Sequence, residues 1–156
     1  MRSMIGNNPF SPGLVLLEDR VAERTSVYRQ DSVEACEGGG ILLGFRKDPH
    51  LHVTHVTEPF STDRRTRISF RRESHGHAQA ALRHWQSSGH TGDYLGEWHT
   101  HPELSPSPSR KDLREWQVLL RDQGRPLLFL IVGIRTSWLG LGNGRTIEQI
   151  QWSDTD

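Results

Sequence analysis

Two histidines separated by a single residue are the most informative feature of the sequence. His99 and His101 lie in a segment whose content favours a β-strand, and Pro102 follows them. Side chains alternate between the two faces of a strand, so both imidazoles project from the same side. A helix needs a spacing of three or four residues for this, as in the H-E-x-x-H zincins. Because Pro102 ends the strand, the sequence predicts two adjacent imidazoles at its open end.

A carboxylate is expected beside this histidine pair. Ser109-x-x-Asp112 follows a loop rich in proline and serine, and it predicts a helix with Ser109 as the N-cap. Asp112 then lies in the first turn, where the chain can return it towards the end of the strand. Two imidazoles and one carboxylate leave the fourth position of a tetrahedral zinc site open for water, as in catalytic zinc sites. Zinc lowers the pKa of such a water to about 7.

Catalysis at such a site also needs a general base, and Glu37 is the best candidate. It precedes Gly38–Gly40 and the apolar run Ile41–Leu43, which is typical of a buried strand. The three glycines allow backbone and substrate to approach each other closely. Glu34 competes for the same role by residue type.

The elements that must position these residues follow from apolar periodicity and turn residues. Met1–Phe10 is predicted to be a flexible N-terminal arm, and residues 11–156 a single domain. In the predicted helix Ser74–Ser88, one apolar stripe contains Ala78, Ala81, Leu82 and Trp85. The order of elements fits an α/β fold with a largely antiparallel or mixed sheet. Predicted strands cover Leu14–Leu17, Ile41–Leu43, His50–Val56, Tyr94–His99, Leu127–Ile134, Ser137–Leu141 and Thr146–Trp152, and predicted helices cover Glu18–Gln30, Ser74–Ser88 and Ser109–Arg121.

Composition limits the possible functions. The 156 residues suffice for one domain, and 19 basic against 19 acidic residues give zero net charge, which argues against general binding to nucleic acid or membrane surfaces. No apolar run approaches the ~18–20 residues of a membrane span. Without a recognisable secretory signal, the chain is expected to be cytoplasmic. The single cysteine, Cys36, excludes an intrachain disulfide and a cysteine-rich zinc site. A metal must therefore be bound by imidazole and carboxylate.

These motifs together resemble the JAMM metalloprotease family, also called JAB or MPN-plus. Its pattern is a glutamate before a glycine-bounded apolar strand, then H-x-H-P, six residues and S-x-x-D. Here the pieces are Glu37-Gly-Gly-Gly40-Ile-Leu-Leu-Gly44, His99-Thr-His-Pro102 and Ser109-Arg-Lys-Asp112, with Glu103–Pro108 between the last two. The match spans about half of the chain. The resemblance implies a JAB/MPN (cytidine-deaminase-like) domain over residues 11–156, with a mixed sheet flanked by helices.

The resemblance also implies a role for each motif residue. His99, His101 and Asp112 would bind zinc. Glu37 would take a proton from the attacking water and deliver it to the leaving amine. Ser109 would donate a hydrogen bond to the developing oxyanion. Members of the family commonly cleave the bond after the C-terminal glycine of ubiquitin or a ubiquitin-like protein.

The short chain and its segment Gly96–Pro102 look most like stand-alone bacterial members of the family. Those accompany activating and conjugating enzymes in antiphage operons such as CBASS and in bacterial ubiquitination-like systems. The expected function is therefore a zinc-dependent isopeptidase or peptidase that removes a ubiquitin-like protein from a conjugate or matures its precursor. Two alternatives stay open: a non-catalytic scaffold of the MPN type, and a peptidase acting on a sulfur-carrier protein.

Two further groups are candidates for supporting roles. Arg64, Arg65 and Arg67 begin a basic run that could meet an acidic face of the ubiquitin-like partner, or whose edge could pair with the partner's extended tail. The simpler interpretation is a solvated loop. Glu97 alternates with His99 and His101, so it could support the metal ligands from the same face of the strand, or it could be an ordinary polar strand residue.

Overall fold

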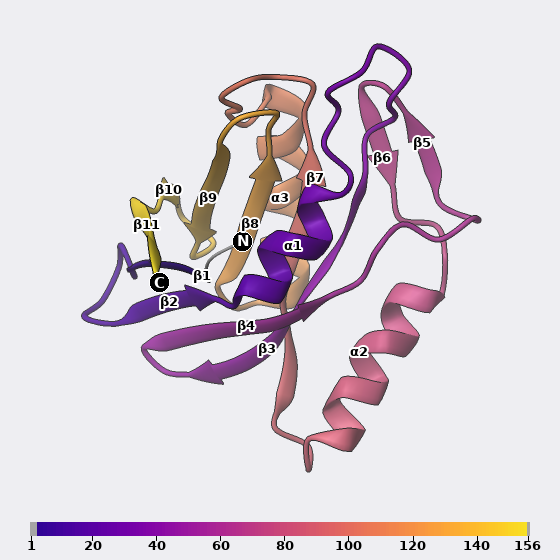
Figure 1. The fold of residues 1–156 in the computed structure, drawn as a ribbon. Coiled ribbons are helices and arrows are strands. Elements are labelled where there is room, and N and C mark those ends of the chain that lie inside the picture. The colour runs from indigo at the N-terminus through magenta and orange to yellow at the C-terminus, as the bar shows by residue number, and fades with distance from the viewer. Residues whose placement is uncertain (1–2, 156) are drawn as a thin grey trace.

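The computed structural model describes residues 3–155, which form a nine-stranded sheet, a separate two-stranded hairpin and three helices (Figure 1). The strands of the sheet lie in the order β10-β9-β8-β7-β3-β4-β2-β1-β11. The elements are β1 (Ser3–Asn7), β2 (Leu14–Leu17), α1 (Asp19–Ser26), β3 (Gly39–Lys47), β4 (His50–Val56), β5 (Arg64–Thr66), β6 (Ser69–Arg71), α2 (Gly76–Ser87), β7 (Gly92–Thr100), α3 (Arg110–Gln123), β8 (Leu127–Val132), β9 (Ser137–Gly142), β10 (Ile147–Gln149) and β11 (Trp152–Thr155).

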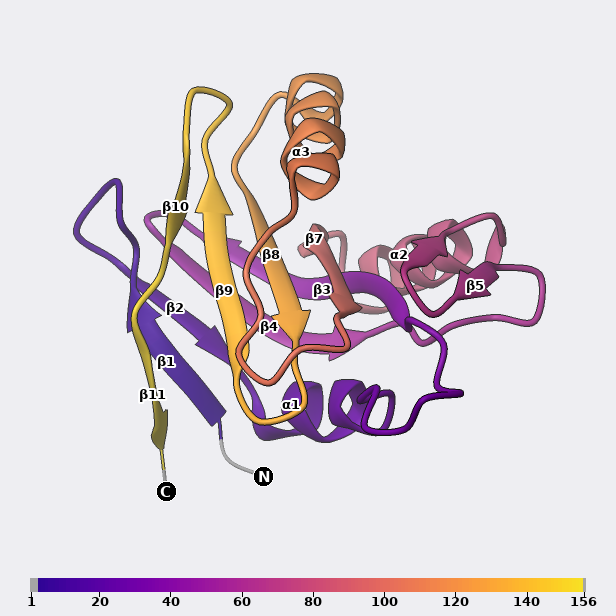
Figure 2. The same ribbon diagram turned by 90° about the horizontal axis from the view of Figure 1, so that it is seen from above.

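The sheet is mixed, which confirms the expected fold class. β2 pairs with β4 and β7 pairs with β8 in parallel, and the other neighbouring strands are antiparallel. Figure 2 shows α1 on one face of the sheet and α3 on the other. Among residues 3–155, no helix combines the length and the apolar character that a membrane span needs.

Two hydrophobic cores lie on the two faces of the sheet. The first contains Val21 of α1 and Trp98 of β7, and the second contains Trp116 of α3. β8 contributes to both cores, because its side chains point alternately to the two faces. The first core contains Leu128, Leu130 and Val132, and the second contains Leu127, Phe129 and Ile131. A strand buried on both faces has no polar side, which explains why this segment is apolar throughout.

A β-bulge interrupts the pairing of β3 with β7. Leu42 is opposite Gly96 and Leu43 is opposite Tyr94, so Leu95 is the extra residue. Gly96 has φ +150°, and a Cβ atom at this position would collide with the carbonyl group of Leu128. The bulge therefore requires glycine here.

The N-terminal segment differs from the expected flexible arm. Ser3–Asn7 form β1, which lies between β2 and β11, and the side chain of Met4 is buried in the first core. The segment carries little apolar periodicity of its own. Its order comes from pairing with strands at both ends of the chain, which a local pattern cannot reveal. Met1 and Arg2 of the predicted arm lie outside the described residues.

The polar stretch after β4 contains the second unpredicted feature, the hairpin of β5 and β6. Asp63 closes its base with four hydrogen bonds from both sides of the hairpin. Its Oδ1 accepts from the backbone N–H groups of Glu73 and Ser74 at 2.9 and 2.8 Å, and its Oδ2 accepts from the N–H of Phe60 at 2.8 Å and from His77 Nε2 at 2.7 Å. The carboxylate is fully buried.

Replacing Asp63 with asparagine should lower the free energy of unfolding by about 2 kcal/mol at pH 7, because an amide NH₂ group faces donors that need an acceptor. Burial raises the pKa of Asp63, but these hydrogen bonds outweigh burial and hold it below the ordinary value. The stabilisation by ionised Asp63 is therefore complete above about pH 4 and is lost as the pH falls through the lower pKa of the folded state.

Urea denaturation of the wild type and the D63N variant at pH 7 and at pH 3 measures both effects. The difference between the two proteins should be smaller at pH 3. The variant D31N, at an exposed position, serves as the control and should unfold like the wild type. An equal stability of D63N and wild type at pH 7 would contradict the role of this carboxylate.

Two smaller differences have local causes. The strand predicted over Thr146–Trp152 is divided into β10 and β11, because Ile150 turns into the first core and its N–H donates to the carbonyl of Leu139. The predicted apolar stripe of α2 is half exposed: Leu82 is 52% and Trp85 42% accessible, and Trp85 stacks on His90 instead.

Candidate metal centre

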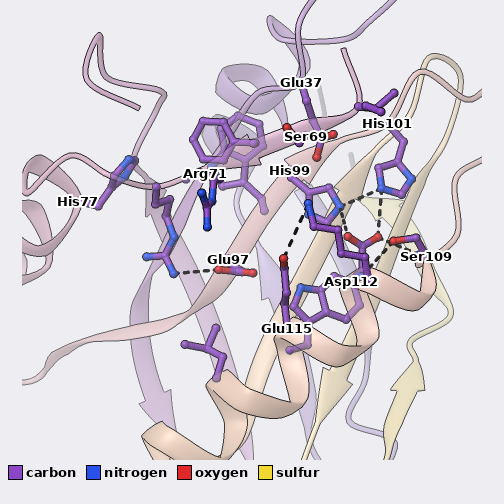
Figure 3. Close-up of a pocket in the computed structure, with 18 of the residues that line it drawn as sticks. Glu37, Ser69, Arg71, His77, Glu97, His99, His101, Ser109, Asp112 and Glu115 are labelled. Atoms are coloured by element: carbon purple, nitrogen blue, oxygen red, sulfur yellow. Dashed lines mark hydrogen bonds and ion pairs between the residues drawn. The ribbon is translucent and has the colours of Figure 1, made fainter. Parts of the chain in front are cut away.

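The site forms where β3, β7 and α3 meet. Gly39 at the start of β3 is paired with His99 near the end of β7, so Glu37 is brought next to residues more than sixty positions later in the chain. The chain then leaves β7 and returns through the proline-rich loop to the start of α3. Figure 3 shows Glu37 and Asp112 on opposite sides of the histidine pair in this view.

The two histidines and Asp112 converge closely. The Nε2 atoms of His99 and His101 are 3.0 Å apart. Asp112 Oδ1 lies 3.4 Å from His99 Nε2, and its Oδ2 lies 3.2 Å from His101 Nε2. Burial raises the pKa of Asp112, but hydrogen bonds from His101 and His99 outweigh it and hold the pKa well below the usual value. The group therefore offers an anionic oxygen beside two imidazole nitrogens.

These separations fit a tetrahedral metal ion. Ligand atoms at 2.0–2.1 Å from zinc are about 3.3 Å apart in a tetrahedral arrangement. The observed distances of 3.0, 3.4 and 3.2 Å are close to this spacing. The two from Asp112 start at its two different oxygens, so the triangle is one of three residues and not of three single atoms. Two lone pairs that face each other at this distance repel unless a cation or a proton lies between them. The donor set suits zinc.

Glu37 is the second carboxylate near the histidines. One of its oxygens lies within 4.8 Å of a ring nitrogen of each histidine, and the residue is 6% exposed. Burial raises the pKa of Glu37 to about 7. A carboxylate with this pKa can both accept and return a proton near neutral pH.

Ser109 and Asp112 also shape the helix that carries them. Ser109 Oγ accepts a hydrogen bond from the N–H of Asp112 at 3.0 Å, and Asp112 Oδ2 accepts from the N–H of Ser109 at 2.9 Å. This capping box confirms the predicted start of the helix. The Ser109 hydroxyl proton stays available for donation, because the cap uses only an oxygen lone pair.

Glu103 supports His101 through the ring nitrogen that does not face the metal position. Its Oε1 lies 2.7 Å from Nδ1 of His101, so an Nδ1–H donor leaves the Nε2 lone pair directed at the metal position. The contact fixes both the tautomer and the ring orientation of His101. Sequence analysis did not single out Glu103, although its position directly after H-x-H-P could have suggested this contact.

Truncating Glu103 should weaken zinc binding by about 10- to 100-fold, because His101 loses the acceptor that orients it. The E103A variant should show this loss in a competition titration with a chromogenic chelator. E103Q should bind more tightly than E103A, since its amide oxygen can still accept from Nδ1. E115A removes an exposed glutamate of α3 and provides the control. Equal zinc affinity in E103A and E115A would exclude this role.

An open cleft of about 720 Å³ lies over the site. The hairpin borders it with β6, and one side of α3, from Lys111 to Asp122, forms another wall. All the predicted metal and catalytic residues line the cleft or its floor. They are Glu37, His99, His101, Ser109 and Asp112.

The predicted supporting residues lie in different places. Glu97 lines the cleft on the histidine face of β7, and its carboxylate pairs with Arg72 at 2.9 Å. Arg64 pairs with Glu73 at 3.1 Å. Arg65 and Arg67 donate to backbone carbonyls, and the residues of this run that line the cleft are Arg71 and Arg72. Contact of Arg64, Arg65 and Arg67 with a partner stays a prediction.

Two buried residues that the sequence analysis missed hold the site together. Thr100, between the two histidines, accepts a hydrogen bond from the N–H of Gly38 and donates one to Gln30 Oε1. Gln30 in turn donates to the carbonyls of Ala35 and Arg67. Their partners are up to 70 residues away in sequence, so no local pattern signals these roles.

Comparison with known proteins identifies the family. The model of prokaryotic homologs of the JAB domain matches residues 20–142. A CD-NTase/cGAS isopeptidase of Escherichia coli is 36% identical over 140 residues, covering 90% of this chain and 88% of that protein. A protein of the same name from Pseudomonas aeruginosa is 40% identical over 128 residues, covering 78% and 81%.

A structural relative supports the same fold. A protein from Desulfitobacterium hafniense, solved in solution, aligns with a TM-score of 0.62 at 21% identity over 85% of this chain and 87% of that one. The family resemblance predicted from the sequence motifs is confirmed. The chain belongs to the prokaryotic JAB-domain family.

Proposed function

We propose that this protein is a zinc-dependent isopeptidase that cleaves after the C-terminal glycine of a ubiquitin-like chain. The observation that carries the proposal is the convergence of His99, His101 and Asp112, with the buried base Glu37 beside them. The relatives of 36–40% identity are named isopeptidases, and a further relative, from Sinorhizobium fredii, is named a probable metalloprotease.

The residues of the site divide the chemistry among them. His99, His101 and Asp112 would hold zinc, which lowers the pKa of water to about 7 and polarises a carbonyl when bound. Glu37 accepts the proton of the attacking water and delivers it to the nitrogen of the scissile bond, so that the amine leaves neutral. Ser109 donates a hydrogen bond from its hydroxyl group to the carbonyl oxygen as negative charge develops there.

Because the similar proteins are named CD-NTase/cGAS isopeptidases, we assign this chain an isopeptide bond in which a CD-NTase takes part. We place the scissile bond in the open cleft over the site, which has a volume of about 720 Å³. The activating and conjugating enzymes that form such a bond would act before this protein.

A cleavage assay with purified components tests the function. The substrate is a CD-NTase conjugate of a ubiquitin-like protein, made with an activating and a conjugating enzyme of known activity. We expect release of the two partners in the presence of zinc, with the glycine carboxylate as the new C-terminus by mass spectrometry. A parallel fusion of a ubiquitin-like protein to a reporter distinguishes peptide from isopeptide cleavage. Absence of cleavage in both substrates by the zinc-loaded protein would refute the proposal.

A further inference from the structure

We propose that Arg65 is a positioning residue that holds the catalytic Glu37 in place from the β5–β6 hairpin. The inference rests on the proposed function of Glu37 as the general base. It gives Arg65 a role different from contact with an acidic partner surface, and the two roles predict different kinetics.

The backbone that carries Glu37 is held from the hairpin side by β5. Glu37 lies two residues before β3 begins, so the strand ladder does not fix it. Its N–H donates to the carbonyl of Thr66 at 2.7 Å. Its own carbonyl accepts from Arg65 Nε at 2.9 Å, and the carbonyl of Cys36 accepts from Arg65 Nη2 at 3.4 Å. One guanidinium thus spans two consecutive peptide groups.

The other side of this segment is held by β7. The N–H of Gly38 donates to Thr100 Oγ1 at 2.9 Å, and the carbonyl of Gly38 accepts from the N–H of Thr100 at 2.9 Å. Thr100 lies between the two histidines of the metal centre. The Glu37 backbone is therefore clamped between the strand that carries the metal ligands and the strand that carries Arg65.

Arg65 is itself well placed for this task. Its guanidinium lies 5.6 Å from the centre of the Tyr28 ring, and that ring is 5.7 Å from the Trp98 ring in the core. The hairpin is anchored near by, since Gln30 Nε2 donates to the carbonyl of Arg67 at 2.7 Å and Asp63 closes the hairpin base. Because the hairpin is anchored, the hydrogen bonds of Arg65 hold the Glu37 backbone at a fixed position relative to it.

The consequence for catalysis follows from geometry. A misplacement of about 1 Å in a reacting group can reduce the rate about 100-fold. Loss of the Arg65 contacts should move Glu37 relative to the histidines without touching any metal ligand. The chemical step should then be slower while binding of metal and substrate is unchanged.

Kinetics of the R65A variant test the proposal. We expect kcat to fall about 10- to 100-fold with KM within about twofold of wild type, and one zinc per chain to be retained. R65K keeps the positive charge, but its single nitrogen cannot span both carbonyls, so most of the loss should remain. R145A removes an exposed arginine of the turn between β9 and β10, which does not line the cleft, and should leave both constants unchanged.

Hydrogen exchange provides a readout independent of activity. The amide of Glu37 should exchange faster in R65A than in wild type and R145A, because its acceptor strand is no longer tied to the segment. A rise in KM at constant kcat, or full rescue by R65K, would overturn the proposal and indicate contact with an acidic partner. Unchanged exchange at Glu37 would also overturn it.

The outcome also separates this inference from the proposed function. If the E37Q variant is inactive while R65A has wild-type kcat, Glu37 is the base and the positioning role of Arg65 is wrong. If E37Q keeps full activity, the proposed function of Glu37 fails, whatever Arg65 does.

Discussion

Replacing Glu37 with glutamine should lower kcat/KM by about 10³-fold or more while the protein still binds one zinc per chain. Glutamine has nearly the shape of glutamate but cannot accept a proton, and general acid–base catalysis contributes roughly 10²–10⁴-fold. The buried position of Glu37 and its raised pKa of about 7 prepare it for proton transfer in both directions. In the proposed site His99, His101 and Asp112 hold the metal, so the expected zinc content of E37Q tests whether Glu37 is a base or a fourth ligand.

Metal analysis and steady-state kinetics on the same preparation check this expectation. E34Q is the matched control, because Glu34 is an exposed glutamate three residues earlier in the same segment. E34Q should retain wild-type activity. A fully active E37Q variant, or an equal loss in E34Q, would assign the base to another residue.

Removal of zinc should abolish activity, and added zinc should restore it. Without the metal, nothing lowers the pKa of the attacking water or polarises the carbonyl, so a decrease of at least about 100-fold is expected. The melting temperature should fall as well, because the metal binds the folded state alone and stabilises it. Dialysis against a chelator, followed by titration with zinc in the activity assay and in a thermal melt, measures both.

The H101A variant tests whether this metal is held at the proposed position. It should remain inactive after zinc is added, because one vertex of the triangle with His99 and Asp112 is missing. H75A removes an exposed histidine just before α2 and should behave like the wild type in both assays. Restoration of H101A by stoichiometric zinc would place the metal elsewhere.

Local pattern predicted the parts of the site that depend on local geometry. Strand alternation placed His99 of β7 and His101, just after its end, on one face, and the S-x-x-D spacing placed Asp112 in the first turn of a capped helix. The apolar runs of β8 and β9 were equally clear. Each of these features is decided within a few residues, so the sequence contains the information directly.

The remaining features depend on distant partners. The hairpin of β5 and β6 is polar and exposed, and its order comes from Asp63, from Gln30 and from the contacts of Arg65 with the Glu37 segment. Such hydrogen bonds leave no periodicity. β1 is ordered by pairing with β11 from the other end of the chain. For the same reason, residue types alone left Glu34 in competition with Glu37 as the base, and the spacing of the family motif favoured Glu37.

The bulge at Leu95 decides which face of the sheet carries the metal site. In an uninterrupted strand, Leu95 would share a face with Glu97 and His99, yet Leu95 lies in the first core together with Trp98. Because of the extra residue, each side chain of β7 after the bulge points to the face opposite to the one that simple alternation from Leu95 would give it. Deleting it would exchange the two faces, so that the histidines pointed into the apolar layer under α1 and Trp98 pointed into the cleft. Building this metal centre into another sheet with the same strand register would therefore require the bulge at Leu95 and Gly96, as well as the ligands themselves.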